Sequence, residues 1–285
     1  MVPELEKIDA WLAARETAVG GVREGCAKQI VWAQSPQKTK LAVVYLHGFS
    51  ATGQEVRPLP DLVAKALGAN LYFARLSGHG QDGAAMGKPR LADWAADVDE
   101  ALAIGAALGD EVIVMGCSTG CTLLTSALAK GAKTKGIVHL SPNFGLRHVL
   151  AHMLLQVPGV RTWGPWLIGR EKTFEPESDG HAAYWTLKYD IQAVFTMADA
   201  VRAAMASEIE TIETPAYFAF GETDQVVSPS KTRRVMARWG GPVVADILVQ
   251  GPQDDKLGHV MAGDVFSPNQ TDALAERLTQ WAKLL

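Results

Sequence analysis

Continuous apolar runs alternate with amphipathic segments along most of this chain. Seven short runs have the character of buried strands, at residues 29–32, 41–46, 70–76, 112–115, 136–140, 216–220 and 244–249. Most are continuous rather than alternating, which is typical of strands covered on both faces. Helical patterns lie between them, at residues 60–67, 91–108, 119–130, 229–239 and 271–285. The alternation predicts an α/β fold, with a mostly parallel central sheet and helices on both faces.

The alternation is interrupted between residues 146 and 210. This segment has no strand pattern, but it contains a helix-like run at 146–156 and several aromatic residues. An insertion of this length inside an alternating fold is more often functional than idle. We therefore predict a mostly helical cap (146–210) between two parts of the core (1–145 and 211–285). Its apolar residues either face a substrate or form a small core of their own, and we place Trp163, Trp166 and the core residue Val226 at a substrate pocket.

Composition and charge exclude several classes of protein. The chain has 285 residues, 48% of them hydrophobic, and a net charge of −4, so it is an ordinary globular protein without the basic surface that binds nucleic acid. Its first residues are charged where a signal peptide would be apolar. The uncharged stretch 112–129 has glycine, serine and threonine at its centre, which favours a strand, a turn and a helix over a membrane span. We expect a cytoplasmic protein without integral membrane association, whose three cysteines are free thiols.

A serine lies between glycines where a predicted strand gives way to a helix. The segment Gly116-Cys117-Ser118-Thr119-Gly120 follows the strand at 112–115 and opens the helix at 119–130. A turn this tight has no room for flanking side chains and holds the serine in a strained conformation, clear of the sheet. Ser118 is therefore the candidate nucleophile. Cys117 stands at a variable position of the motif and is interpreted as a small buried residue.

A serine hydroxyl needs a base to take its proton and a carboxylate to orient that base. Catalytic groups of a parallel sheet lie in loops beyond the carboxyl ends of its strands. Among seven histidines, His259 meets this criterion best, because it lies in a polar loop between the last strand and the last helix. Asp224 follows the strand at 216–220 and gives the chain order Ser, Asp, His that accompanies this turn. Glu222, Asp254 and Asp255 remain competing carboxylates.

The developing oxyanion of an acyl-transfer reaction needs two backbone amides. One candidate is the amide of Thr119, at the start of the helix. The other is the amide of Phe49 in His47-Gly48-Phe49-Ser50, where glycine permits close approach of the backbone to a substrate.

With these residues in place, the chain resembles the α/β-hydrolase superfamily, and within it serine esterases such as monoacylglycerol lipases and bacterial carboxylesterases. The resemblance rests on His47-Gly48-Phe49, Leu76-Ser77-Gly78-His79-Gly80, the Ser118 turn, Gly221 with Asp224 and Val227, and Gly258-His259. It implies an α/β-hydrolase fold, a triad of Ser118, Asp224 and His259, an oxyanion hole at Phe49 and Thr119, and a lid formed by the insertion. No motif within the insertion names a substrate.

The function that we predict is hydrolysis of carboxylic esters with an apolar acyl group, without metal or organic cofactor. Carbon–carbon bond hydrolysis or acyl transfer could use the same three side chains, and a non-catalytic ligand-binding protein of this fold is a further alternative.

Residues 78–83 match a dinucleotide fingerprint, but Gly87 and Pro89 intervene before any helix. His148 and His152 lie one helical turn apart but have no third metal ligand at a suitable spacing. The oligomeric state stays open.

Overall fold

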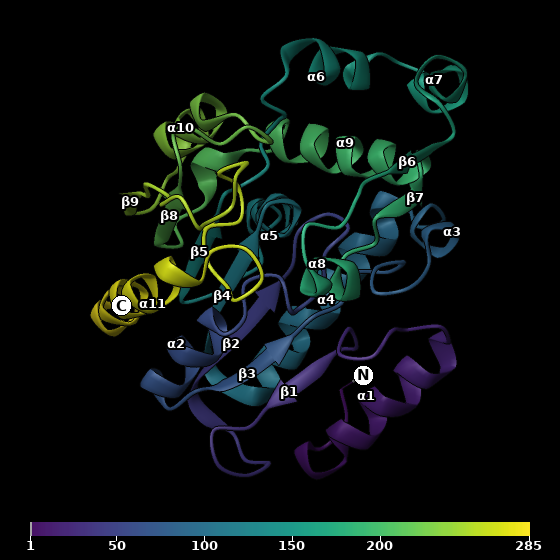
Figure 1. Ribbon diagram of the computed structural model, residues 1–285. Helices are drawn as coiled ribbons and strands as arrows, with labels where there is room; N and C mark the ends of the chain where they lie inside the picture. The colour runs from purple at the N-terminus through teal and green to yellow at the C-terminus, as the bar shows by residue number, and fades with distance from the viewer. Residues whose placement is uncertain (1) are drawn as a thin grey trace.

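The computed structural model describes residues 2–285, which are built around a seven-stranded sheet (Figure 1). The strand order is β1-β3-β2-β4-β5-β8-β9, and within the described chain all neighbouring pairs of this sheet are parallel except β1 with β3. The strands are β1 Gln29–Val31, β2 Thr39–Leu46, β3 Asn70–Phe73, β4 Gly109–Cys117, β5 Gly136–Leu140, β8 Ala216–Phe220 and β9 Val243–Ile247. Each predicted strand corresponds to one of them, so the predicted fold class is confirmed.

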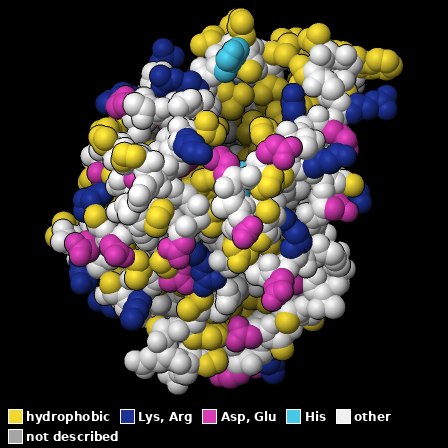
Figure 2. Space-filling model, in the orientation of Figure 1, with side chains coloured by type: hydrophobic (Ala, Val, Ile, Leu, Met, Phe, Trp, Pro, Cys, Tyr) yellow, Lys and Arg dark blue, Asp and Glu magenta, His cyan; other side chains and the backbone are white. Residues whose placement is uncertain are grey.

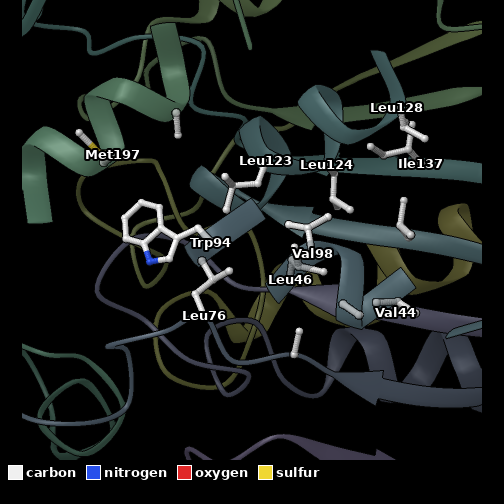
Figure 3. Close-up of a cluster of buried hydrophobic side chains, with 14 of the residues drawn as sticks. Val44, Leu46, Leu76, Trp94, Val98, Leu123, Leu124, Leu128, Ile137 and Met197 are labelled. Carbon is white, nitrogen blue, oxygen red and sulfur yellow. The ribbon is translucent and has the colours of Figure 1, made fainter. Parts of the chain in front are cut away.

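Helices cover both faces of the sheet, and β2 shows why. Val43 and Tyr45 belong to one cluster of buried side chains, whereas Val44 and Leu46 belong to the other, because successive side chains of a strand point to opposite faces. Helices α2 (Leu59–Leu67) and α11 (Pro268–Leu284) cover the first face. Helices α4 (Leu91–Leu108) and α5 (Thr119–Ala129) cover the second, where Figure 3 shows Trp94 and Val98 beside Leu123 and Leu124.

The remaining helices of the core lie at its periphery. They are α1 (Leu5–Val19), the short α3 (Gly83–Met86) and α10 (Pro229–Arg238), with a 3₁₀ turn at Ile209–Thr211. Residues 112–129, the uncharged stretch, comprise most of β4, the serine turn and α5. No helix within residues 2–285 has both the length and the apolar character needed to cross a bilayer.

The segment between β5 and β8 contains four α-helices and a small two-stranded antiparallel sheet. The helices are α6 (Val149–Gln156), α7 (Val160–Ile168), α8 (Asp179–Tyr184) and α9 (Gln192–Met205), and β6 (Glu171–Thr173) pairs with β7 (Lys188–Asp190). The sequence predicts helices here but no strands. In Figure 1, α6, α7 and α9 lie over the end of the sheet where β4 gives way to α5. The segment is therefore placed above the Ser118 turn.

Candidate active site

Ser118 lies on the sharp turn that joins β4 to α5. Its φ of 48° and ψ of −109° are rare for a residue with a side chain, so the backbone is strained there. A Cβ at Gly120 would lie 2.3 Å from the carbonyl oxygen of Leu46, and one at Gly116 would lie 2.7 Å from the amide nitrogen of Cys121. Both flanking positions therefore require glycine, as the motif predicts.

Neighbouring loops hold this strained turn by its backbone. The amide of Ser118 donates to the carbonyl oxygen of Leu140 at 2.9 Å, and the carbonyl oxygen of Ser118 accepts from the amide of Asn143 at 3.1 Å. These bonds connect the turn to the end of the neighbouring strand β5 and to the loop that follows it. Because the main chain is fixed in this way, the Ser118 side chain is directed at the cavity that it helps to line.

Asp224 and His259 come together at the same end of the sheet. Their side chains are hydrogen-bonded, with His259 Nδ1 2.8 Å from Asp224 Oδ2. The other carboxylate oxygen of Asp224 accepts from the amides of Val226 (2.7 Å) and Val227 (2.9 Å), so its orientation is fixed. With Nδ1 bonded to Asp224, Nε2 is the other ring nitrogen of His259, and the side chains of Ser118 and His259 both line one cavity.

The electrostatic surroundings favour a protonated His259. Burial alone would lower the pKa of its imidazole, because a charged ring loses its hydration. The carboxylate of Asp224 opposes this through charge and hydrogen bonding, and Glu55 and Asp255 add to it, so that the pKa of His259 is raised above its ordinary value. The site is thus built to stabilise an imidazolium.

The competing carboxylates have other roles in the structure. Glu222 pairs with Arg233 at the surface, and Asp254 accepts from the amide of Gly251. Asp255 accepts from the amides of Leu257 (3.0 Å), His259 (2.8 Å) and Val260 (2.7 Å). Asp255 therefore shapes the loop that carries His259. The sequence signal for this role of Asp255 is its place before a turn that contains glycine, because the short side chain of aspartate often accepts hydrogen bonds from nearby backbone amides.

Of the two residues predicted to supply oxyanion donors, Phe49 lines the cavity and Thr119 directly follows Ser118. Thr119 is the first residue of α5. Within residues 2–285, neither amide takes part in the turn and loop hydrogen bonds of the backbone. The Phe49 ring packs against Tyr189 of β7 at 5.2 Å between centroids, so this loop also contacts the inserted segment.

The cavity itself has a volume of about 300 Å³. Its walls combine Ser118, His259 and Glu55 with apolar side chains from the core and from the insertion, namely Phe49, Leu146, Phe174, Trp185, Leu187, Tyr189, Met197, Val226, Leu257, Val260 and Phe266. Figure 2 shows hydrophobic side chains gathered around a hollow near the top of the molecule. Val226 is thus at the cavity, as predicted.

Trp163 and Trp166 are not at this cavity, which corrects their predicted position. Both belong to α7, which lies beyond α9 in Figure 1. Trp163 packs on the buried core of the described chain, whereas Trp166 is 85% exposed. The aromatic walls come instead from Phe174, Trp185 and Tyr189, which follow α7 in the chain. Spacing along a helix could not reveal which helix of the insertion faces inward.

Other candidate chemistry has structural explanations. His148 caps α6, because its Nδ1 accepts from the amide of Ala151 at 3.2 Å. Within residues 2–285 no group of three or more His, Cys, Asp or Glu side chains is arranged to hold a metal ion. Gly83 opens only the four-residue helix α3, and a Cβ there would collide with the backbone of Lys188. The glycine loop at 78–83 therefore packs against β7 instead of opening toward a dinucleotide.

Comparisons with known proteins give the family of this chain. The family model described as serine aminopeptidase, S33, a hydrolase family, matches residues 37–250. The chain belongs to this family. It is 30% identical over 113 residues to the thermostable monoacylglycerol lipase of Bacillus sp. (strain H-257), and that match covers 40% of this chain and 45% of the relative. The chain therefore spans less than half the length of this curated relative.

Solved structures show the same fold. One described with the metagenome-derived lipolytic enzymes LipS and LipT has a TM-score of 0.75 at 20% identity, and covers 93% of this chain and 100% of its own. A soluble variant of the monoglyceride lipase of Saccharomyces cerevisiae, in complex with a substrate analogue, has a TM-score of 0.66 at 13% identity over 90% of each chain. The predicted α/β-hydrolase fold and the resemblance to monoacylglycerol lipases are thereby confirmed.

Proposed function

We propose that this protein is a serine hydrolase that cleaves carboxylic esters with an apolar acyl group. The observation that carries the proposal is the Asp224–His259 pair, joined at 2.8 Å, whose histidine lines the same cavity as the strained Ser118. The family assignment and the likeness to a monoacylglycerol lipase support it.

The chemistry follows from the roles of the three side chains. Ser118 Oγ attacks the ester carbonyl carbon while its proton passes to Nε2 of His259, and Asp224 stabilises the imidazolium that forms. The amides of Phe49 and Thr119 stabilise the oxyanion of the tetrahedral intermediate. Collapse breaks the bond to the alcohol, which leaves with the proton from His259. Water then attacks the acyl-enzyme by the same route, and the acid and free Ser118 result.

The apolar cavity supports the substrate class. Most of its lining side chains are apolar and include five aromatic residues from the core and the insertion. Such walls suit an acyl chain. Polar side chains of the insertion, among them Glu175, Glu177 and His181, also line the cavity. We propose that residues 146–210 act as the cap over this cavity. Acyl transfer to another acceptor, or carbon–carbon bond hydrolysis, would use the same triad and is the alternative.

A fluorophosphonate probe tests the proposal directly. We expect the probe to label the wild-type protein but not Ser118→Ala. The control variant Ser126→Ala, whose serine lies further along α5, should be labelled like the wild type. Rates on p-nitrophenyl esters from acetate to palmitate, a monoacylglycerol and an aminoacyl p-nitroanilide then define the substrate. Labelling that survives Ser118→Ala, or turnover of the anilide with none of the esters, would defeat the ester-hydrolase proposal.

A further inference from the structure

A second buried carboxylate lies beside the proposed catalytic groups. Glu55 follows the Phe49 loop and is 3% exposed. Its Oε2 accepts from the amide of Gly48 at 2.7 Å and from the hydroxyl of Tyr45 at 3.0 Å. Tyr45 is in β2, and Gly48 is in the turn that follows this strand. One oxygen of Glu55 therefore ties the start of the loop to its own strand.

The other oxygen of Glu55 is close to the nucleophile. A Cβ placed on Gly48 would lie 2.6 Å from Glu55 Oε1 and 3.1 Å from the Cβ of Ser118. The side chains of Glu55 and Ser118 thus both lie next to the position that a Cβ of residue 48 would occupy, so only glycine fits there. Glu55 also lines the cavity that Ser118 and His259 border. A carboxylate is costly to bury, so its place here calls for an explanation.

The charge of Glu55 is coupled to the state of His259. Burial raises the pKa of Glu55, while the donors at Gly48 and Tyr45, the His259 imidazole and the Cys117 thiol oppose that rise. The coupling is mutual, because Glu55 is among the groups that raise the pKa of His259, after Asp224 and alongside Asp255. When Ser118 gives up its proton, the new positive charge therefore forms on a ring whose charged state both Asp224 and Glu55 favour.

We propose that Glu55 is a positioning residue of the reaction: it holds the turn that presents the Phe49 amide, and it supplies a second carboxylate that stabilises the His259 imidazolium. This inference rests on the proposed function. Glu55 is the side chain that accepts from the Gly48 amide, at the start of this turn. Glutamine in its place would keep an oxygen for the two donors but lose the charge, whereas alanine would lose both.

The two variants separate the two roles. For Glu55→Gln we expect the acidic limb of the kcat/KM profile to move to lower pH, with a loss of rate of roughly tenfold or less at neutral pH. For Glu55→Ala we expect the same shift and a further fall in kcat, on the order of a hundredfold, with little change in KM, because the turn that presents the oxyanion donor loses its bond to the side chain of residue 55. A boronic acid that mimics the tetrahedral intermediate should bind more weakly in the same proportion. Glu276→Gln, an exposed change on α11, is the control and should match the wild type.

The outcomes distinguish this inference from the proposed function. If the wild type is labelled at Ser118 but Glu55→Gln keeps the wild-type pH profile, or Glu55→Ala keeps the wild-type kcat, Glu55 has no such role and the hydrolase proposal still stands. If the wild type is not labelled, the hydrolase proposal itself fails. Thermal unfolding of each variant shows whether it is folded. Should Glu55→Ala not fold, the nearly isosteric Glu55→Gln alone decides, through its pH profile.

Discussion

The ring of His47 has one tautomer that its neighbours can accommodate. The amide of Leu76 donates to Nε2 at 3.1 Å, so Nδ1 carries the hydrogen and donates to the carbonyl oxygen of Gly48 at 2.8 Å. That carbonyl and the Phe49 N–H belong to one trans peptide group and point in opposite directions. Fixing the carbonyl therefore fixes the proposed oxyanion donor. Burial lowers the pKa of His47 to about 4, which keeps the ring neutral in this role.

Asp224→Asn should change both the rate and its pH dependence. The raised pKa of His259 places the acidic limb of the wild-type kcat/KM profile above pH 6.5, because the protonated ring cannot act as a base. Loss of the carboxylate leaves burial as the stronger influence, so the limb moves to lower pH. We expect kcat to fall by about 10³- to 10⁴-fold. The measurement is a pH–rate profile on a p-nitrophenyl ester, with the exposed Asp272→Asn as control. A limb that stays in place would exclude Asp224 as the partner of His259.

Ser118, Asp224 and His259 could be proposed from sequence because the chemistry of each comes with a local pattern. The glycines around Ser118 signal the turn, and the loops of Asp224 and His259 follow predicted strands. Glu55 could not be assigned in this way. Its role depends on which groups the fold brings to it, and a carboxylate in a polar loop is usually exposed to solvent.

At the scale of single elements, the turn between β4 and α5 depends on the absence of a side chain at Gly120. We expect Gly120→Ala to destabilise the protein by about 1–3 kcal/mol or more, because the added methyl group would meet the backbone of Leu46. Urea unfolding measures the loss. Ser126→Ala, on the same helix but partly exposed, should unfold at nearly the wild-type midpoint. An unchanged midpoint for Gly120→Ala would mean that the turn tolerates a different geometry.

The ends of a helix or strand could be predicted from sequence only where the apolar pattern of its buried residues also ends. Strand β4 begins at Gly109, three residues before the predicted run, because Gly109 and Glu111 pair with Thr39 and Leu41 of β2 while the exposed Asp110 and Glu111 interrupt the apolar pattern. The pairing of β6 with β7 was missed for a related reason. Its strands are three residues long and contain lysine, so they have no hydrophobic period.

At the scale of the whole molecule, the cavity is formed jointly by the sheet end and the insertion. Met197 of α9 is 7% exposed and lines the cavity from the insertion. We expect Met197→Trp to reduce kcat/KM for octanoate esters by about tenfold while acetate esters are hydrolysed at nearly the wild-type rate, because a larger ring shortens the acyl space. Met153→Trp, on the exposed side of α6, is the control. Equal losses on both esters would place the acyl chain elsewhere.

The whole fold also depends on pH through histidines that are buried without charge. Burial lowers the pKa of His139 to about 3, and its ring lies between Phe144, Phe218 and Trp239. An unfolded chain binds a proton at this residue below pH 6.5, whereas the folded chain does not until about pH 3. The contribution of His139 to stability is therefore complete above pH 6.5 and falls as the pH drops from 6.5 toward 3, by about 1.4 kcal/mol for each pH unit at most.

His139→Leu removes this contribution and should make the protein less sensitive to acid. Within residues 2–285 no protein group bonds either ring nitrogen of His139, so the leucine loses no hydrogen bond and avoids burying an unpaired N–H. We expect the free energy of unfolding in urea to be equal to or above that of the wild type at pH 7, and the advantage to grow between pH 6.5 and 4.5. His148→Leu, a change at an exposed helix cap, should show no such growth. His47 and His79, whose pKa values are also lowered by burial, keep part of the acid sensitivity in the variant. A variant whose stability no longer depends on pH, or one whose pH dependence equals that of the wild type, would contradict the role given to His139.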